Sequence, residues 1–288
     1  NSQMTKNKHQ INLITMLGSI HDKSCLINLF KNHQINTLYH SAAYKHVHLV
    51  ENNIIEGIKN NVIGTYNLAD VAVKFGVENF ILISSDKAVK PSNYMGKSKR
   101  ISEYICKYFS KKQNFSKFTC VRFGNVLGSS GSVIPIFNEQ ISNGGPVTVT
   151  DKDTTRYFMT IDEAAQLVIQ AGAISKSGKT YILDMGKPIK ILELAKKMIN
   201  LRGLSSYLEN DKKGGDIKIK FVGLQKGEKL HEELYNSAKP IKTLHSKIFE
   251  VDDINIKLNE FEKFIKKTDK YCEKNDIIRL KSLLSHYK

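Results

Sequence analysis

Short apolar runs alternate with longer amphipathic stretches through the first 125 residues of the chain. A short apolar run is typical of a buried strand, whereas apolar residues spaced three or four apart are typical of a helix. These patterns predict strands at residues 11–17, 37–43, 80–84 and 118–123. They predict helices at 25–30, along a stretch that ends at Gly76, and at 93–111. Such alternation is typical of a parallel, doubly wound α/β sheet.

The pattern changes after Phe123, where glycines become frequent. Beyond this point the sequence predicts strands at 147–150, 180–183 and 217–222, and helices that begin at Asp162, at Ile191 and near Lys229. The tail from Asn255 is lysine-rich and amphipathic, with apolar positions at Leu258, Phe261, Ile265, Ile277, Ile278 and Leu280. We therefore expect two parts, residues 1–125 and 126–288, with some segments of the second part returning to the first sheet.

Composition excludes several classes of protein. The chain has 288 residues, of which 41% are hydrophobic and 25% charged, as in ordinary globular proteins. No window approaches the length of apolar sequence that spans a membrane, and the first residues lack the apolar stretch of a secretory signal. The four cysteines form no C-x-x-C pair, so we expect neither a metal site nor a disulfide framework. A reducing, cytoplasmic compartment is the expectation.

The formal net charge of +16 raises the question of an anionic partner. Nucleic acid is one such partner, but the basic residues are scattered and are not grouped with aromatic residues. We therefore expect no nucleic-acid binding. Attraction to anionic nucleotide-sugars, or to an anionic membrane surface, fits the charge equally well.

Candidate chemistry follows the strand predicted at 80–84. Ser84 and Ser85 end the apolar run, an acid and an amine follow at Asp86 and Lys87, and Lys99 lies twelve residues further on, in a predicted helix. Open α/β sheets present their functional groups at the carboxyl edge of such strands. An adjacent carboxyl and amine can donate and remove protons beside one substrate.

These residues resemble the centre of an extended short-chain dehydrogenase/reductase. Asp86-Lys87, followed by Met95-Gly-Lys-Ser-Lys99, is similar to the capsule-polysaccharide and flagellin-glycosylation branch of nucleotide-sugar 4,6-dehydratases, which has Met in place of the usual Tyr of Tyr-x-x-x-Lys. The resemblance covers roughly residues 11–240. Its other matching segments are 42–51, 60–65, 122–135, 155–164 and 223–234.

The resemblance implies a Rossmann-like, doubly wound parallel sheet with a smaller C-terminal α/β substrate-binding lobe. Residues 1–125 would be part of an NAD-binding domain, and residues 126–288 mainly the lobe. The implied reaction is NAD-dependent dehydration of a UDP-N-acetylhexosamine to a 4-keto-6-deoxy sugar nucleotide for surface polysaccharide or glycan synthesis. The favoured substrate is UDP-N-acetylglucosamine. A nucleotide-sugar 4-epimerase and a non-catalytic fragment of such an enzyme are the alternatives.

The resemblance also assigns residues. Asp86 would protonate the leaving C6 hydroxyl and Lys87 would remove the C5 proton, with the reverse assignment left open. Lys99 would hold the nicotinamide ribose, and Met95, which cannot relay a proton, would occupy the catalytic tyrosine position. The expected cofactor contacts, with NAD in preference to NADP, are Asp22, Ala42, Ala43, Tyr44, Asn61, Ser84 and Lys99. The expected substrate contacts are Lys45, Ser85, Asn125, Arg156 and Glu228.

Three single positions need a separate comment. Asp22 suits a helix N-cap as well as a cofactor contact. Tyr94 stands beside Met95, but its spacing to Lys99 is wrong for the catalytic base. Gln225 stands where the family usually has Arg, so one phosphate contact is expected to be absent or to be replaced by Lys226.

A glycine-rich turn is missing from the sequence, because no G-x-x-G-x-x-G occurs in it. Dinucleotide folds use that turn to bind the pyrophosphate at a helix N-terminus. We therefore expect an N-terminally incomplete sheet and a C-terminal piece of a longer protein. A homo-oligomer is also expected, and membrane association is left open through an upstream region.

Overall fold

The computed structural model describes residues 12–129, 131–208, 211, 214–236 and 239–285. Its largest sheet has six strands in the order β1-β2-β3-β8-β13-β12. The strands are β1 (Thr37–His40), β2 (Asn79–Ile83), β3 (Lys117–Arg122), β8 (Lys179–Leu183), β13 (Ile248–Val251) and β12 (Ile241–Lys242). The first four run parallel, whereas β13 is antiparallel to β8 and β12 to β13. The predicted parallel α/β sheet is therefore confirmed.

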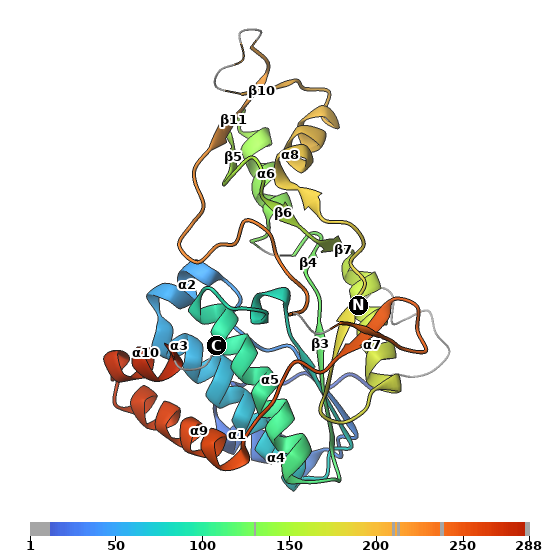
Figure 1. Cartoon of the computed structure of the whole chain (residues 1–288), viewed down its shortest axis with the longest axis vertical. Helices are drawn as coiled ribbons and strands as arrows, with labels where there is room; N and C mark the ends of the chain where they lie inside the picture. Colours follow the sequence, from blue (N-terminus) through green and yellow to red (C-terminus); the bar gives the residue numbers. More distant parts are fainter. Residues whose placement is uncertain (1–11, 130, 209–210, 212–213, 237–238, 286–288) are drawn as a thin grey trace.

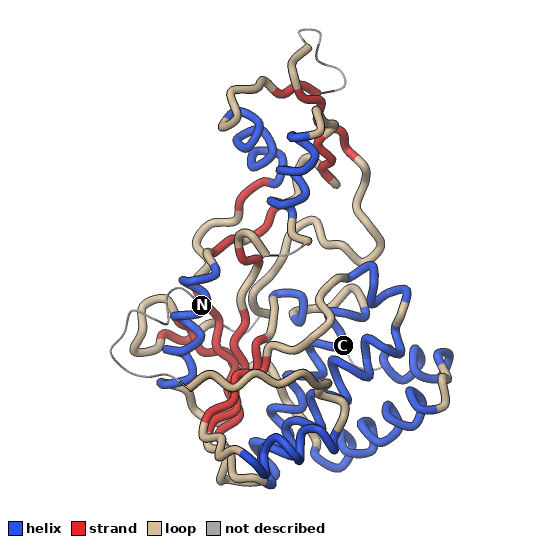
Figure 2. Tube along the Cα trace, turned by 180° about the vertical axis from the view of Figure 1, so that it is seen from behind, coloured by secondary structure: helices blue, strands red, loops and turns tan. Residues whose placement is uncertain are grey.

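Helices cover both faces of this sheet (Figures 1 and 2). One face carries α1 (Lys23–Asn32), α3 (Ile54–Ile58), the π-helix η2 (Lys59–Gly64), α4 (Thr65–Lys74) and α5 (Tyr94–Lys112). The other carries α7 (Ile161–Ile174), which contacts β3 and β8. Strand side chains alternate between the faces. Phe80 and Leu82 thus join the core under α4 and α5, and Ile81 joins the core under α7.

Local sequence explains where these helices begin and end. The Asp22 carboxylate accepts hydrogen bonds from the backbone N–H groups of Ser24 and Cys25, at 3.0 and 3.1 Å, so it caps α1 as predicted. Asn93 caps α5 in the same way, through the Gly96 N–H at 2.7 Å. Gly76 follows α4 with a φ of 74°, a conformation that glycine adopts without strain.

A smaller lobe forms the narrow end of the molecule (Figure 1). Its three-stranded parallel sheet has the order β10-β11-β5. The lobe contains β5 (Val147–Val149), β10 (Ser206–Leu208), β11 (Ile217–Phe221), α6 (Val133–Ser142) and α8 (Ile191–Asn200). Two short strand pairs lie between the lobe and the large sheet: β4 (Asn125–Val126) with β7 (Phe158–Met159), and β6 (Thr155–Arg156) with β9 (Ile189–Lys190). Segments beyond residue 125 also return to the large sheet, as α7, β8, β12 and β13.

The C-terminal tail forms a helical hairpin of α9 (Leu258–Glu273) and α10 (Ile277–Ser285) against α5 and α3. The amphipathic pattern predicted there is confirmed at Phe261, Ile265 and Leu280, which are buried. Ile277 and Ile278 differ, with exposed fractions of 40% and 79%. Within the described residues, no helix combines the length and the apolar character needed to cross a bilayer.

Three predicted elements differ from the structure. Residues 12–17 form no strand, and Leu13, Ile14, Met16 and Leu17 are exposed; residue 11 lies outside the described residues. A strand persists only when a neighbour accepts its hydrogen bonds, and no strand of the described chain pairs with this segment. No helix forms near Lys229 either, because side chains there bond to residues far away in the sequence. The strand predicted at 37–43 ends at His40.

Candidate active site

A cavity of about 320 Å³ lies at the carboxyl ends of β1, β2 and β3. Ser41 lines it after β1, Ser84 and Ser85 after β2, and Gly124 and Asn125 after β3. The carboxyl ends of parallel strands share one edge of the sheet, which brings these polar groups together. Of the predicted residues, the structure places Ala43, Lys45, Ser84, Ser85, Lys87, Met95, Lys99 and Asn125 around this cavity.

Lys87 lies at the cavity wall with its side chain 24% exposed. Its Nζ is 3.1 Å from Oδ1 of Asp86 and 3.3 Å from Oε1 of Glu232. Asp86 is fully buried beneath it and does not line the cavity, although its Oδ1 also accepts a hydrogen bond from Ser85 Oγ at 2.7 Å. The Ser85 hydroxyl therefore connects the Asp86 carboxylate to the cavity.

The charge of Lys87 follows from these neighbours. Burial lowers the pKa of its amine, but Asp86 and Glu232 more than offset burial, so the pKa is raised above its ordinary value. Lys87 is therefore an ammonium group at neutral pH, held between two carboxylates.

Lys99 has a different environment, although it lines the same cavity. Its Nζ donates to the backbone carbonyl of Ile83 at 2.9 Å, and burial lowers its pKa to about 8. Met95 lies one turn earlier on α5 and is only 2% exposed. The Ser84 hydroxyl is directed to the Glu103 carboxylate, at 2.7 Å.

Asn61 fixes the loop that follows β1. Its side chain is fully buried in η2; its Oδ1 accepts from the Tyr44 N–H at 2.7 Å and its Nδ2 donates to the Tyr44 carbonyl at 3.0 Å. A second cavity of about 520 Å³ adjoins the first and is lined by Tyr44. Ala42 lines neither cavity, and Asp22 acts as the cap of α1. A π-helix turn inside a helical segment is frequent at functional sites.

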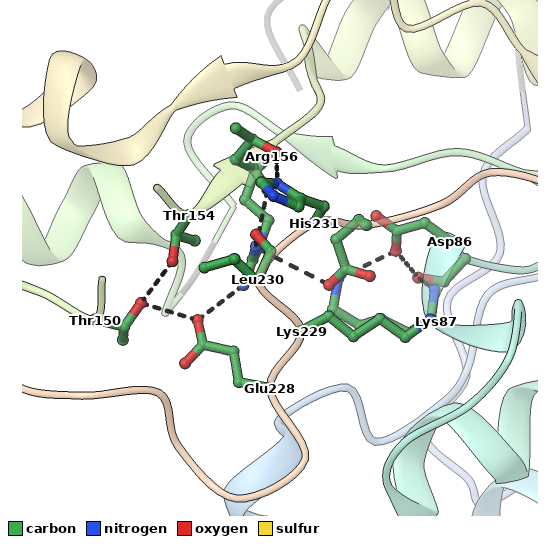
Figure 3. A network of polar contacts seen from close by, with 12 residues as sticks. Asp86, Lys87, Thr150, Thr154, Arg156, Glu228, Lys229, Leu230 and His231 are labelled. Carbon is green, nitrogen blue, oxygen red and sulfur yellow. Dashed lines mark hydrogen bonds and ion pairs between the residues drawn. The ribbon is translucent and has the colours of Figure 1, made fainter. Parts of the chain in front are cut away.

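Arg156 and Glu228 lie outside the cavity lining. Arg156 donates to the carbonyls of Thr155 and Leu230 at 2.8 and 3.2 Å and to Oε1 of Glu228 at 2.8 Å. Figure 3 shows this network, with Asp86 and Lys87 at one end, Arg156 between, and Glu228 with Thr150 at the other. The structure thus connects these two predicted residues to the site without bringing them to the cavity.

Two functional candidates had no assignment in the sequence. Glu232 joins the network because its Oε1 lies 3.3 Å from Lys87 and 3.8 Å from Arg156 Nε. The sequence marked only its segment, residues 223–234, as similar to the family. The role of Glu232 itself was not predictable, because its partners Lys87 and Arg156 are remote in sequence.

His40 is the second unassigned residue. It is buried at the end of β1, with Nε2 2.8 Å from Thr65 Oγ1. Since Thr65 donates its proton to the Asn61 carbonyl at 2.7 Å, His40 Nε2 must be the donor to Thr65. Burial first, and Lys99 second, lower the pKa of His40 to about 3, so the ring is neutral.

Comparison with known proteins identifies the family. Residues 1–253 match the family described as polysaccharide biosynthesis protein. The chain is 50% identical over 222 residues to the probable polysaccharide biosynthesis protein EpsC of Bacillus subtilis, which covers 77% of the chain and 36% of EpsC. It is 30% identical over 227 residues to the UDP-N-acetylglucosamine 4,6-dehydratase (inverting) of Campylobacter jejuni, covering 77% of the chain and 62% of that protein.

A solved structure agrees with this relationship. The structure of Pen from Bacillus thuringiensis is similar, with 32% identity and a TM-score of 0.72, over 88% of the chain and 80% of Pen. The chain itself spans about a third of the length of EpsC, 36%. Its motifs, its sheet and these similarities agree, and the chain belongs to the polysaccharide biosynthesis protein family within the extended short-chain dehydrogenases/reductases.

Proposed function

We propose that this chain carries the catalytic site of an NAD-dependent 4,6-dehydratase that serves polysaccharide synthesis. Its substrate is a UDP-N-acetylhexosamine, and UDP-N-acetylglucosamine is the favoured candidate. The observation that carries the proposal is Lys87 at the cavity wall, in contact with two carboxylates, one of which, Asp86, is connected to the cavity through the Ser85 hydroxyl. Dehydration needs an acid and a base beside one sugar ring, and Lys87 and Asp86 supply both. The similarity to the UDP-N-acetylglucosamine 4,6-dehydratase (inverting) of Campylobacter jejuni supports the same reaction.

The donor set at the cavity fits one end of a nicotinamide dinucleotide. Lys99 presents a buried amine that suits ribose hydroxyls, and Ala43 lines the same cavity. Bound NAD would accept a hydride from C4 of the sugar and return it to C6. In the described part of the chain no glycine-rich turn opens a helix at this cavity, and we assign no residue to the pyrophosphate.

The charge state of Lys87 favours the reverse of the first assignment of roles. As an ammonium, Lys87 donates its proton to the departing C6 hydroxyl, which leaves as water. Asp86 takes the C5 proton through the Ser85 hydroxyl, which donates to it at 2.7 Å. The 3.1 Å contact between Asp86 and Lys87 then returns that proton to the amine, so the pair is restored after the loss of one water. The proton that the C4 hydroxyl releases on oxidation passes to water through the hydroxyl of Ser84 or Ser85, which line the cavity, and C5 regains one proton from there when the hydride returns to C6.

The test is to incubate the chain, alone and with any upstream coding sequence, with UDP-N-acetylglucosamine and NAD. The product is then identified by mass spectrometry and NMR. We expect a 4-keto-6-deoxy product, lighter than substrate by one water, with NAD needed only in catalytic amount. A product that retains the C6 oxygen would instead establish a 4-epimerase. No turnover by any form would favour a non-catalytic fragment.

A further inference from the structure

Glu232 lies on the loop of residues 223–236, called here the Glu232 loop, which leaves the small lobe and returns toward the large sheet. Three hydrogen bonds hold this loop against residues 89–93. Ser92 Oγ and Asn93 Nδ2 both donate to the Gly227 carbonyl, at 2.7 and 2.8 Å, and Lys229 Nζ donates to the Val89 carbonyl at 2.7 Å. Gly227 has a φ of 80°, and a Cβ there would lie 2.7 Å from Asn93 Cβ.

The Glu232 carboxylate is buried, with its side chain only 4% exposed. Its Oε1 is shared between Lys87 and Arg156, while its Oε2 is buried and has no hydrogen-bond partner among the described residues. A buried carboxylate is strongly destabilising unless cations compensate it. Lys87 is the nearer of its two cations, at 3.3 Å against 3.8 Å for Arg156.

Asp86 alone would hold Lys87 weakly in one orientation. Its Oδ1 is shared between Lys87 and the Ser85 hydroxyl, and in the described part of the chain its Oδ2 has no hydrogen-bond partner. A lysine side chain has a flexible four-carbon stem and a compact charge, so a single neighbouring contact restricts it little. Two carboxylates restrict the ammonium group more closely, because they belong to separate elements, the turn at residue 86 and the Glu232 loop.

We propose that Glu232 is a positioning residue: it holds the Lys87 ammonium group at the cavity wall and makes that placement depend on the docked Glu232 loop. Its effect on turnover rests on the proposed dehydratase function, whereas its effect on Lys87 itself does not. Among the described residues, the charged groups that act most strongly on Lys87 are Asp86, Glu232 and Arg156. Removing the Glu232 charge leaves Asp86 opposed by Arg156, so the ammonium form loses part of its stabilisation.

The first measurement follows Lys87 directly, without substrate. Lysine side chains of the 288-residue chain are labelled with ¹³C, and the Lys87 signal is assigned by its loss in Lys87→Arg. We expect Lys87 to titrate at a clearly lower pH in Glu232→Gln than in the unaltered chain. Glu233→Gln is the matched control, because Glu233 neighbours Glu232 but pairs with the exposed Lys90 at 2.7 Å. Glu233→Gln should leave the Lys87 titration unchanged.

The second measurement is the pH profile of turnover in the form that is active on UDP-N-acetylglucosamine. In Glu232→Gln we expect kcat to fall about tenfold or more, because a misplaced catalytic group loses rate steeply with small displacements. The alkaline limb of the profile should also move to lower pH. Glu232→Asp retains the charge and should recover part of both losses. Thermal unfolding of each variant separates these effects from loss of the fold.

The outcomes distinguish the two proposals. An unchanged Lys87 titration in folded Glu232→Gln overturns the positioning role, whatever the activity. An equal shift in Glu233→Gln overturns it as well, because the effect would then be one of overall charge. If the Lys87 titration shifts as expected but no form produces a dehydrated sugar, the positioning role stands and the proposed function fails.

Discussion

At the scale of the residue, the site depends on how each ionisable group is surrounded. Lys87 and Lys99 line one cavity, yet carboxylates raise the pKa of the first and burial lowers that of the second. This difference agrees with the different tasks proposed for the two lysines, proton donation by Lys87 and hydroxyl binding by Lys99.

Replacing Lys87 tests the chemical assignment. We expect Lys87→Ala or Asp86→Asn to lower turnover by about a hundredfold or more, the range for losing a positioned acid or base. Nucleotide-sugar affinity should change far less, and product formation and equilibrium binding measure the two effects. Lys196→Ala, at a partly exposed position on α8 in the small lobe, is the control. Near-normal rates in both site variants would contradict the assignment.

His40 makes stability depend on pH. Its folded pKa of about 3 lies below the ordinary value of 6.5, so the unfolded chain binds a proton that the folded chain excludes. The contribution of neutral His40 to the free energy of unfolding is fully present above pH 6.5. This contribution is lost as the pH falls toward 3, by at most about 1.4 kcal/mol per pH unit.

Urea unfolding at pH 7.5 and 5.5 measures this dependence. His40→Gln can still donate to Thr65 and should show a smaller loss between the two pH values than the unaltered chain. His48→Gln, at an exposed position, should leave the loss unchanged. An equal loss in all three proteins would mean that other groups account for it.

At the scale of the element, buried charge joins parts that are distant in sequence. Arg122 on β3 donates to Glu103 on α5 at 2.6 and 2.7 Å and to Asp253, after β13, at 2.8 and 3.0 Å. Arg122 and Glu103 are fully buried. This group fixes the helix that carries Met95 and Lys99 to the strand beside them, and Glu103 also accepts from Ser84 at the cavity.

Removing the arginine should therefore be strongly destabilising. Arg122→Met leaves the buried carboxylates of Glu103 and Asp253 with only Arg100 as a cation among the described residues, at 3.1 and 3.4 Å. One cation in place of two leaves their charge incompletely compensated, and we expect a loss of about 3 kcal/mol or more in the free energy of unfolding. The double variant Arg122→Met, Glu103→Met should recover part of that loss. Arg279→Met removes an exposed pair and should cost about 1 kcal/mol or less. Denaturant titration measures the free energy of unfolding of all three variants. A small effect in Arg122→Met would contradict the prediction and show that Arg100 alone compensates both carboxylates.

Strands and helices with a local signal were predictable, and contacts between remote segments were not. The apolar run before Ser84 and the spacing along residues 93–111 predicted β2 and α5 closely, because their side chains pack with strand or helical periodicity. The helix expected near Lys229 was wrong because Lys229 and Glu232 are fixed by Val89 and Lys87. The same remoteness hid Glu232 from the sequence, although its segment had been recognised.

At the scale of the whole molecule, the large sheet ends at β1 within the described chain, and β1 pairs only with β2. The side of β1 that faces away from β2 leaves backbone donors and acceptors available to a further strand. Nearby in sequence, Leu13, Ile14, Met16 and Leu17 expose 59%, 56%, 53% and 102% of their surface. An open parallel edge together with exposed apolar residues is typical of a surface that another segment covers.

These features predict how the chain binds NAD. In the proposed function, Lys99 and Ala43 at the cavity would contact the nicotinamide end, while no glycine-rich helix N-terminus for the pyrophosphate occurs in the described part of the chain. We expect the 288-residue chain alone to bind NAD weakly by calorimetry. An upstream segment that supplies a strand for β1 and a glycine-rich turn, fused or added as a separate chain, should restore binding. The same segment carrying alanine in place of its glycines should still pair with β1 yet fail to restore it. Tight binding by the isolated chain would mean that the groups already at the cavity suffice for the whole dinucleotide.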